Sequence, residues 1–303
     1  SGSGKTTLVL ESLVPALQAR INGTASPEHI RALQADGIRR VNVIDATPIG
    51  TNIRSTVATY SGVLDDLRRI FAAAPAAKEL GYKAGDFSNN TGSLHCPTCD
   101  GTGQITMDIQ FLPDVEIVCP DCGGSRYAKE AEKIRYLPKK ADAGHGISLP
   151  ELMSCTVKQA LDQMSGVKKV RERLQVLYDL GLGYLTLGEA TPALSGGEAQ
   201  RLKIASEMGK SQEDAVFIFD EPTIGLHPLD TRVLIRVFQK LIDNGATVIV
   251  IEHDLDMIAN ADYVIDMGPG GGKSGGQIVA AGTPEEIAEK GNSLTGQYLK
   301  SLV

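Results

Sequence analysis

The stretch Leu194-Ser-Gly-Gly-Glu-Ala-Gln-Arg201 decides the fold of this chain. Two consecutive glycines follow Ser195, and glycine lets the backbone N–H groups approach a ligand closely. Residues 198–208 are predicted to form a helix whose positive dipole end points back at these glycines. Helix starts of this kind bind phosphate. The stretch therefore predicts contact with phosphate groups.

Three further motifs accompany this stretch. They are Gly2-Ser-Gly-Lys-Thr-Thr7, Ala215-Val-Phe-Ile-Phe-Asp-Glu221 and Val248-Ile-Val-Ile-Glu-His-Asp254. In this order and spacing, the four motifs resemble the ATP-binding cassette (ABC) ATPases. The resemblance implies a doubly wound α/β, ABC-type P-loop nucleotide-binding domain with an inserted, mainly helical signature domain. It also implies that the signature residues contact ATP held by another cassette; these are Ser195, Gly196, Gly197 and Glu198.

The length and composition of the chain restrict the class of protein. Its 303 residues are enough for two or so domains, and a hydrophobic content of 42% is enough to build cores in both. The formal net charge of -7 argues against a broadly basic nucleic-acid-binding surface, although a local patch can bind DNA on an acidic protein. No apolar run approaches the roughly 18 residues that span a bilayer, and no signal sequence is visible. We therefore expect a soluble, cytoplasmic protein with no membrane partner.

The start of the chain carries most of a phosphate-binding loop. Such a loop reads G-x-x-x-x-G-K-[ST] after a strand, and this chain opens two residues after the place of the first glycine. We interpret the chain as a fragment of a longer protein. Lys5 is expected to reach the β- and γ-phosphates of ATP and Thr6 to bind Mg²⁺, whereas the alternative is a glycine-rich helix start without nucleotide. The residues expected to bind ATP are Ser1, Gly2, Ser3, Gly4, Lys5, Thr6 and Thr7.

Two carboxylates end the apolar strand predicted at residues 215–219. Open α/β sheets bind ligands beyond the carboxyl ends of their strands, and two adjacent acids in that place are rarely structural. We expect Asp220 to hold Mg²⁺ through water and Glu221 to act as the catalytic base on the attacking water. The ABC resemblance implies that His253 contacts the γ-phosphate and that Asp230 lies in the loop facing the partner cassette.

Four of the five cysteines form two C-x-x-C pairs, Cys96-Pro-Thr-Cys99 and Cys119-Pro-Asp-Cys122. The spacer between the pairs falls within the range of about 15–20 residues that is typical of zinc sites. Four thiolates close a tetrahedral structural site and leave no vacant position for catalysis. Zinc is therefore favoured over free thiols or a disulfide pair. Residues 104–111 alternate apolar and polar side chains, and residues 115–118 are predicted to pair with them as a hairpin.

A narrower resemblance, to the C-terminal ATPase half of the UvrA family, lies in the loops and beside the cysteines. The matching residues are Asp45-Ala-Thr-Pro-Ile-Gly50, Arg54-Ser55, Ala58-Thr-Tyr60, Phe111-Leu-Pro-Asp-Val115 and Arg126-Tyr127. One position departs from the family, because Ala46 stands where UvrA carries a glutamine that senses Mg²⁺ and the attacking water. Alanine can do neither, so we expect slow hydrolysis or a residue that was changed.

The UvrA resemblance implies ATP-dependent recognition of damaged double-stranded DNA in bacterial nucleotide excision repair. It implies an ABC-type ATPase without nuclease activity of its own, and no second acidic cluster follows Asp220-Glu221. The implied cofactors are ATP, Mg²⁺ and Zn²⁺. The implied partners are damaged DNA, a UvrB-type protein that binds through the missing N-terminal half, and a second copy in a homodimer of the full-length protein.

A basic stretch at residues 126–140 adjoins the second cysteine pair. Lysine and arginine outnumber acids in it, and such side chains neutralise DNA phosphates in a sequence-independent way. From composition alone, a solvated helix and strand surface is an equally good interpretation. The UvrA resemblance favours DNA contact, with Arg126, Tyr127 and Lys129 as the candidate residues.

These motifs predict the layout of the chain. We expect the nucleotide-binding domain at residues 1–50 and 189–303, and the inserted signature domain at 51–188 with its zinc module at about 87–127. Predicted helices cover residues 7–20, with Pro15 as a kink or early end, and residues 63–77, 157–164, 168–180 and 284–290. Predicted strands cover residues 41–45, 215–219, 246–251 and 277–281.

Two alternative functions stay open. An ATPase of a transporter or of a ribosome-binding ABC factor would share the ATP motifs, but neither explains the four-cysteine module. A UvrA-like paralogue that serves resistance to DNA-binding drugs would share that module as well, and Ala46 keeps this alternative open.

Overall fold

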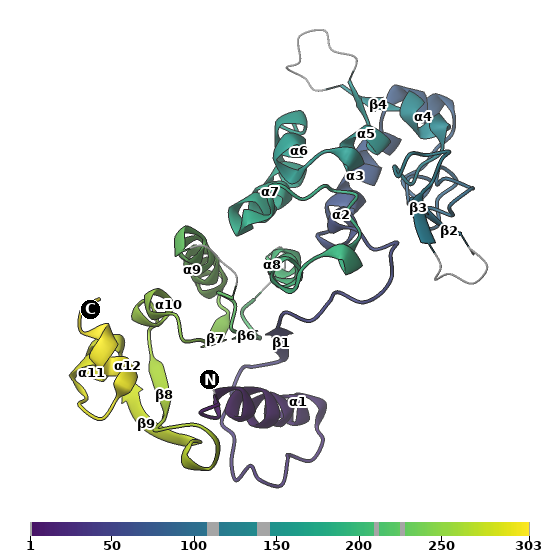
Figure 1. Cartoon of the computed structure of the whole chain (residues 1–303). Coiled ribbons are helices and arrows are strands. Elements are labelled where there is room, and N and C mark those ends of the chain that lie inside the picture. The colour runs from purple at the N-terminus through teal and green to yellow at the C-terminus, as the bar shows by residue number, and fades with distance from the viewer. Residues whose placement is uncertain (1, 108–114, 138–145, 209–211, 225–227, 303) are drawn as a thin grey trace. The chain divides into compact units, whose positions relative to one another are not determined.

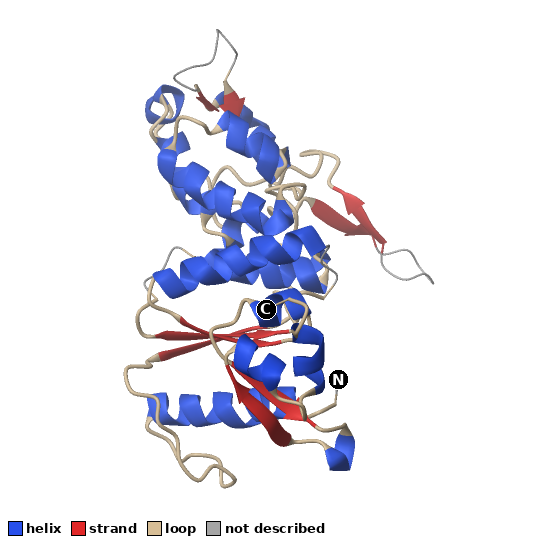
Figure 2. Cartoon of the chain, turned by 90° about the vertical axis from the view of Figure 1, so that its left-hand side faces the viewer, coloured by secondary structure: helices blue, strands red, loops and turns tan. Residues whose placement is uncertain are grey.

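The computed structural model describes residues 2–107, 115–137, 146–208, 212–224 and 228–302. The chain folds into two compact units. The first unit consists of Ser1–Ala46 and Lys210–Val303, and the second unit consists of Thr47–Gly209. The sequence analysis placed the boundaries at residues 50 and 189, whereas the structure groups the signature stretch with the helices and cysteines of the second unit. Strands of a parallel sheet characterise the first unit, and helices predominate in the second (Figure 2).

The first unit opens with a helix that changes type along its length. A π-helical stretch, η1 (Thr7–Leu13), runs directly into α1 (Val14–Asn22). Pro15 follows the π-helical turns, where the backbone leaves the regular i−4 pattern and the N–H of Val14 donates to the carbonyl of Val9, five residues earlier. The helix therefore continues past Pro15 and ends at Gly23, whose φ of 67° is the left-handed conformation that glycine adopts without strain.

A three-stranded parallel sheet forms the centre of the first unit (Figure 1). Its strand order is β1 (Arg40–Ile44), β6 (Ala215–Asp220) and β7 (Thr247–Ile251), with Ile44 opposite Phe219 and Asp220 opposite Ile251. The middle strand is buried from its first residue to Phe219, as an apolar strand between two neighbours should be. All three strands thus end at one edge of the sheet, and the acids after β1 and β6 lie there.

The two faces of β6 pack against different helices, because successive side chains of a strand point to opposite faces. Val216 and Ile218 form a cluster with Val14 of α1. On the other face, the ring of Phe219 lies 4.4 Å from that of Phe238 in α9 (Pro228–Asp243). Helices α1 and α9 therefore cover opposite faces of the sheet (Figure 1).

The chain after β7 forms a small α/β layer. Strand β8 (Val264–Gly268) pairs antiparallel with β9 (Gln277–Gly282), and the short helix η5 (Gly272–Ser274) lies between them. Helices α10 (Leu255–Ala259), α11 (Pro284–Glu289) and α12 (Leu294–Leu299) pack around the fully buried Ile287 and Leu299. The predicted strand and helix near the C-terminus are confirmed.

The second unit is a helical assembly with two small hairpins. Its helices are α2 (Val57–Tyr60), α3 (Val63–Ala72), α4 (Pro75–Glu79), η2 (Lys129–Lys133), α5 (Leu149–Ser154), α6 (Val157–Gln163), α7 (Lys168–Leu177), η3 (Tyr178–Leu182), η4 (Thr191–Ala193) and α8 (Gly196–Glu207). Its hairpins pair β2 (Gln104–Met107) with β3 (Val115–Val118), and β4 (Arg135–Tyr136) with β5 (Ile147–Ser148). Among the described residues, no helix combines the length and the apolar character needed to cross a bilayer.

The single helix predicted at residues 63–77 is wrong, since the structure contains two. Helix α3 ends at Ala72 and α4 starts at Pro75. The residue before a proline is disfavoured in the helical conformation, and Ala74 accordingly has an extended ψ of 144°. The apolar periodicity of the segment continues across this break, which is why the pattern alone did not reveal it.

A buried carboxylate joins two helices of the second unit. The Asp66 side chain of α3 is 7% exposed, with one oxygen 2.8 Å from the ammonium of Lys169 and the other 3.0 Å from Nε of Arg173. Both basic residues belong to α7. Neighbouring Asp65 is 67% exposed and pairs with Arg68, at 3.2 Å.

We expect Asp66→Ala to lower the free energy of unfolding by about 2–3 kcal/mol, because it leaves Lys169, Arg173 and also Arg69, at 3.6 Å, without their buried partner. Asp65→Ala is the matched control and should cost less than about 1 kcal/mol, as exposed ion pairs do. Urea unfolding followed by circular dichroism measures both values. Equal effects of the two substitutions would contradict a structural role for Asp66.

Candidate functional site

The phosphate-binding loop depends on its glycines. Gly2 and Gly4 have φ angles of 87° and 94°, which strain any other residue. A Cβ at Gly4 would also lie only 3.2 Å from Cα of Gly276. The glycine-rich segment before β9 packs onto this loop, since the N–H of Gly276 donates to the carbonyl of Ser3 at 2.9 Å.

The helix after this loop begins at the residues predicted to bind ATP. The N–H of Leu8 donates to the carbonyl of Gly4 at 2.9 Å, so Lys5 and Thr6 lie in the first turn. Lys5 is half-buried and Thr6 is exposed. Ser1 lies outside the described residues. The loop thus combines a helix N-terminus, a lysine and a hydroxyl, which together suit the phosphates of a nucleotide and a bound cation.

Carboxylates gather at the carboxyl edge of the parallel sheet. Asp45 directly follows β1 and Glu221 directly follows β6, which itself ends at Asp220. The pKa of Asp220 is raised above its ordinary value by burial and then by the negative charges of Glu221, Asp45 and Glu252. Such a cluster of oxygen ligands suits a hard divalent cation. The sequence analysis assigned no role to Asp45 or Glu252, although the position of Asp45 at a strand end was a usable signal.

We expect Asp220→Asn to stabilise the nucleotide-free chain at neutral pH by roughly 0.5–1 kcal/mol, because it removes a disfavoured charge. A raised carboxyl pKa means that the stabilising contribution is present below the ordinary pKa of about 4 and declines as the pH rises through the raised value. Between about pH 4 and pH 7, the free energy of unfolding measured with urea should therefore fall less for Asp220→Asn than for the unsubstituted chain. The exposed Asp262→Asn is the control, and an equal response of both variants would contradict this origin.

Glu221 has an unusual backbone conformation. Its φ of 45° lies in the left-handed region, which costs a non-glycine residue on the order of 1–3 kcal/mol. Its N–H donates to the carbonyl of Ile251, at the end of β7, at 2.9 Å. The carboxylate lies 3.9 Å from Nδ1 of His253, whose side chain is 67% exposed. The structure thus brings together the predicted base and the predicted γ-phosphate contact, and the imidazole is open to a ligand.

The signature stretch of the second unit starts a capped helix. Ser195 is the N-cap of α8 and Glu198 accepts from it, with Oε2 2.7 Å from the backbone N and 2.8 Å from Oγ. The hydroxyl of Tyr184 donates to the other carboxylate oxygen of Glu198. Burial raises the pKa of Glu198, but the hydrogen bonds from Tyr184 and Ser195 outweigh it and the net pKa is lowered. The carboxylate therefore stays ionised. Gly196 and Gly197 form the first turn of α8, whereas the helix was predicted to begin only at Glu198.

The four cysteines predicted to bind a metal form one cluster. Their sulfur atoms all lie within 4.8 Å of one another. The Sγ atoms of Cys96 and Cys119 are 3.9 Å apart and those of Cys99 and Cys122 are 3.7 Å apart, which excludes disulfides. A tetrahedron with metal–sulfur bonds of about 2.3 Å has edges of about 3.8 Å, so the spacing fits Zn²⁺. The N–H of Gly103 points at Cys99 Sγ at 3.3 Å, as expected for a thiolate knuckle.

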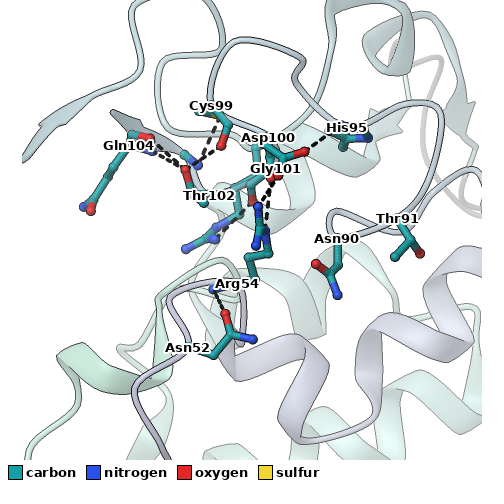
Figure 3. Close-up of polar contacts among 12 residues, drawn as sticks. Asn52, Arg54, Asn90, Thr91, His95, Cys99, Asp100, Gly101, Thr102 and Gln104 are labelled. Atoms are coloured by element: carbon teal, nitrogen blue, oxygen red, sulfur yellow. Dashed lines mark hydrogen bonds and ion pairs between the residues drawn. The ribbon is translucent and has the colours of Figure 1, made fainter. Parts of the chain in front are cut away.

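The cysteine knuckle is joined to the loop that carries Asn52 and Arg54. Arg54 reaches Asp100 in the knuckle and forms an ion pair with it, and His95 lies 3.3 Å from the other oxygen of Asp100 (Figure 3). From the knuckle side, Nη1 of Arg126 donates to the carbonyl of Ile53 at 2.9 Å. The knuckle and the loop are thus held together by charge-assisted contacts in both directions.

The structure changes the expectation for the residues predicted to contact DNA. Arg126 is 5% exposed and donates to backbone carbonyls. Tyr127 is 2% exposed, and its hydroxyl donates to the carbonyl of Phe87 at 3.0 Å. Because both side chains are buried and bonded within the unit, their burial argues against direct DNA contact, whereas Lys129 is exposed. The side chain of Asp230, residues 138–145 and Phe111 lie outside what the structure describes.

Comparison with known proteins gives a consistent result along the whole chain. No family model matches. The chain is 47% identical over its full length to UvrABC system protein A of Bacillus subtilis (strain 168), of which it covers 31%. It is 44% identical to UvrABC system protein A of Staphylococcus aureus (strain COL), again over its full length and 31% of that protein.

A solved structure agrees with these sequence matches. The crystal structure of UvrA2 from Deinococcus radiodurans matches 100% of this chain and 36% of its own with a TM-score of 0.85, at 40% identity. This match confirms the fold class predicted from the motifs. The chain spans about a third of the length of these relatives. Over that span, the chain is similar to UvrABC system protein A in sequence and to UvrA2 in both sequence and structure.

Proposed function

We propose that this chain is the ATP-binding and ATP-hydrolysing C-terminal part of a DNA-damage-recognition subunit in bacterial nucleotide excision repair. The observation that supports this proposal most strongly is the match to UvrABC system protein A over the entire chain, which includes the ATP motifs and the cysteine cluster. A transporter or ribosome-binding ATPase would leave the cluster unexplained. A second candidate, which Ala46 keeps open, is a UvrA-like paralogue that serves resistance to DNA-binding drugs. The identity to UvrA2 is 40%, below the 47% to UvrABC system protein A.

In this proposal, the first unit binds MgATP. The loop residues Gly2 to Thr7, preceded by Ser1, surround the phosphates, with Lys5 neutralising the β- and γ-phosphates. Thr6 and Asp220 would hold Mg²⁺, which supplies charge neutralisation on the phosphates when bound.

Glu221 accepts a proton from the attacking water in the proposed reaction, and His253 donates a hydrogen bond to the γ-phosphate. Ser195, Gly196, Gly197 and Glu198 contact ATP bound by a second cassette, and Asp230 faces that cassette. Hydrolysis therefore depends on association. Because Ala46 is exposed and has no polar group to position water, we propose that the reaction is slow.

The four cysteines hold Zn²⁺ as a structural ion in this proposal. Their cluster keeps the knuckle at residues 94–107 and 115–127 folded and attached to the loop around Arg54. The proposed partners are damaged double-stranded DNA, a UvrB-type protein bound through parts outside this chain, and a second copy of the complete protein. We assign no nuclease activity to the chain itself.

Binding of duplex DNA by the zinc-loaded chain tests this proposal. Fluorescence anisotropy is measured with and without one bulky lesion, across a salt series, and with Cys119→Ala as the knuckle variant. A lesion preference that the variant loses supports damage recognition by the cysteine module. Equal, weak and steeply salt-dependent binding of both duplexes would mean that this part of the protein is a motor and that discrimination lies elsewhere.

A further inference from the structure

The carboxylate of Glu252 is buried beside the proposed ATPase centre. Its side chain is only 3% exposed, whereas the side chain of the adjacent His253 is 67% exposed. Glu252 follows β7 directly. A buried carboxylate is costly unless hydrogen bonds compensate the lost water, so its partners indicate what it does.

Glu252 accepts four hydrogen bonds, and its two oxygens serve different turns. Oε1 accepts from the backbone N–H of Thr223 at 2.9 Å and from the Thr223 hydroxyl at 2.5 Å. Oε2 accepts from the backbone N–H of His253 at 2.8 Å and from that of Asp254 at 3.2 Å. One carboxylate thus joins the turn after β6 to the turn after β7.

These two turns carry the groups proposed to act on ATP. Thr223 lies two residues after Glu221, and the carbonyl of Glu221 accepts from the N–H of Ile224 at 3.2 Å within the same turn. Glu221 holds a left-handed backbone conformation, which persists only where the surrounding contacts impose it. The bonds of Glu252 to Thr223 and to the His253 backbone supply such contacts on both sides of the gap between Glu221 and His253.

We propose that Glu252 is a positioning residue that sets the distance and orientation of Glu221 relative to His253. This inference rests on the proposed ATPase function. Glu252 acts through the two turns, because its buried carboxylate is fully engaged with protein donors. The 3.9 Å separation between the Glu221 carboxylate and Nδ1 of His253 is the geometry that it maintains.

The bonding pattern explains why this position requires glutamate. Glutamine keeps one oxygen acceptor, so it satisfies one turn and turns an amide N–H₂ toward the donors of the other. Aspartate is one methylene shorter and reaches only one of the two turns. Alanine leaves all four donors unsatisfied in a buried site.

The test compares Glu252→Gln and Glu252→Ala with the exposed Glu28→Gln and Glu28→Ala as matched controls. Assays use the 303-residue chain at concentrations where the rate per chain is constant, so that each site has its partner signature stretch. We expect kcat for ATP hydrolysis to fall by roughly 10- to 100-fold in Glu252→Ala and by less in Glu252→Gln, with KM within about threefold, because small misplacements of catalytic groups cost this much. The Glu28 controls should keep the starting rate.

A double substitution separates positioning from general stability. If Glu252 acts through Glu221, then Glu252→Gln should lower kcat no further in a Glu221→Gln chain. Amide hydrogen exchange gives a readout that does not need hydrolysis. The N–H groups of Thr223, His253 and Asp254 should exchange faster in Glu252→Gln while the centre of β6 keeps its protection.

The outcomes distinguish this inference from the function on which it rests. Unchanged kcat and unchanged exchange in Glu252→Gln would overturn the positioning role alone, provided that Glu221→Gln is inactive. Additive losses in the double variant, or a KM that rises with no change in kcat, would also overturn it. If the unsubstituted chain neither binds nor hydrolyses ATP, the ATPase proposal fails and the positioning role fails with it. Should Glu252→Ala not fold, Glu252→Gln and Thr223→Val, which removes one donor, carry the same comparison.

Discussion

Glu221→Gln is expected to lower kcat for ATP hydrolysis by about 10²- to 10³-fold while the Kd for ATP stays within about threefold. Glutamine keeps the size and the hydrogen-bonding reach of the side chain but does not accept a proton from water at neutral pH. The backbone of residue 221 is held by its bond to Ile251 and by the strained turn, so the substitution changes the chemistry without moving the chain. Phosphate release and equilibrium binding of a fluorescent ATP analogue measure the two quantities.

The kcat of Glu221→Gln must be compared with the kcat of the unsubstituted chain, because Ala46 is expected to make hydrolysis slow in both. Glu28→Gln, at an exposed site, is the matched control for loss of one negative charge. A Glu221→Gln chain that keeps more than about a tenth of the starting rate would assign the base elsewhere, since general-base catalysis contributes at least about 10²-fold. If the variant loses ATP binding as well as hydrolysis, Glu221 instead holds the nucleotide or its cation.

Cys119→Ala is expected to abolish zinc binding and to unfold the knuckle at residues 94–107 and 115–127. Cys119 is fully buried, and its sulfur is one of four that lie within 4.8 Å of one another. The hairpin of β2 and β3 is short, with exposed side chains along β3, so apolar packing contributes little to it. A structural zinc site supplies on the order of 10 kcal/mol, so three thiolates in place of four should leave this segment unfolded at ordinary free zinc concentrations.

Metal analysis by mass spectrometry and limited proteolysis check this prediction. The matched control is Cys155→Ala, because Cys155 lies outside the cluster and its Sγ donates to the carbonyl of Glu151. The control should retain one zinc per chain and the starting proteolysis pattern. Full zinc content and unchanged proteolysis in Cys119→Ala would contradict a structural metal site. Loss of the knuckle should also expose Arg54 and Arg126, whose partners lie within it or on the attached loop.

Short-range patterns were sufficient to predict much of this protein. The buried parallel strand at residues 215–220, the capped helix at the signature stretch and the cysteine hairpin each follow from local composition, because strand and helix periods differ and the turn residues stand at defined offsets. The signature helix starts two residues earlier than predicted, since Ser195 caps it and both glycines enter its first turn. Local rules also explain the break before Pro75, although apolar periodicity concealed it.

Three features were not predicted from the sequence, and the second and third depend on contacts between distant residues. Pro15 lies within a continuous helix, directly after turns with π-helical bonding. Arg126 and Tyr127 are residue types that are common on DNA-binding surfaces. In the structure both are buried, and they donate to the backbone carbonyls of Ile53 and Phe87. In the sequence, nothing distinguishes Glu252 from the other acids. In the structure, its carboxylate accepts from Thr223, which lies 29 positions earlier in the chain.

By itself, the sequence determined which residues of this protein are candidates for the chemistry, because glycine loops, strand-end acids and paired cysteines need particular residue types at short spacing. Only the tertiary structure decided which of these side chains are exposed to a ligand and which are buried. It also decided that the acids after β1, β6 and β7 meet at one sheet edge and that Glu252 faces inward there. The physical reason is that burial and hydrogen-bond pairing across a sheet edge are set by strand order and register, which no local pattern specifies.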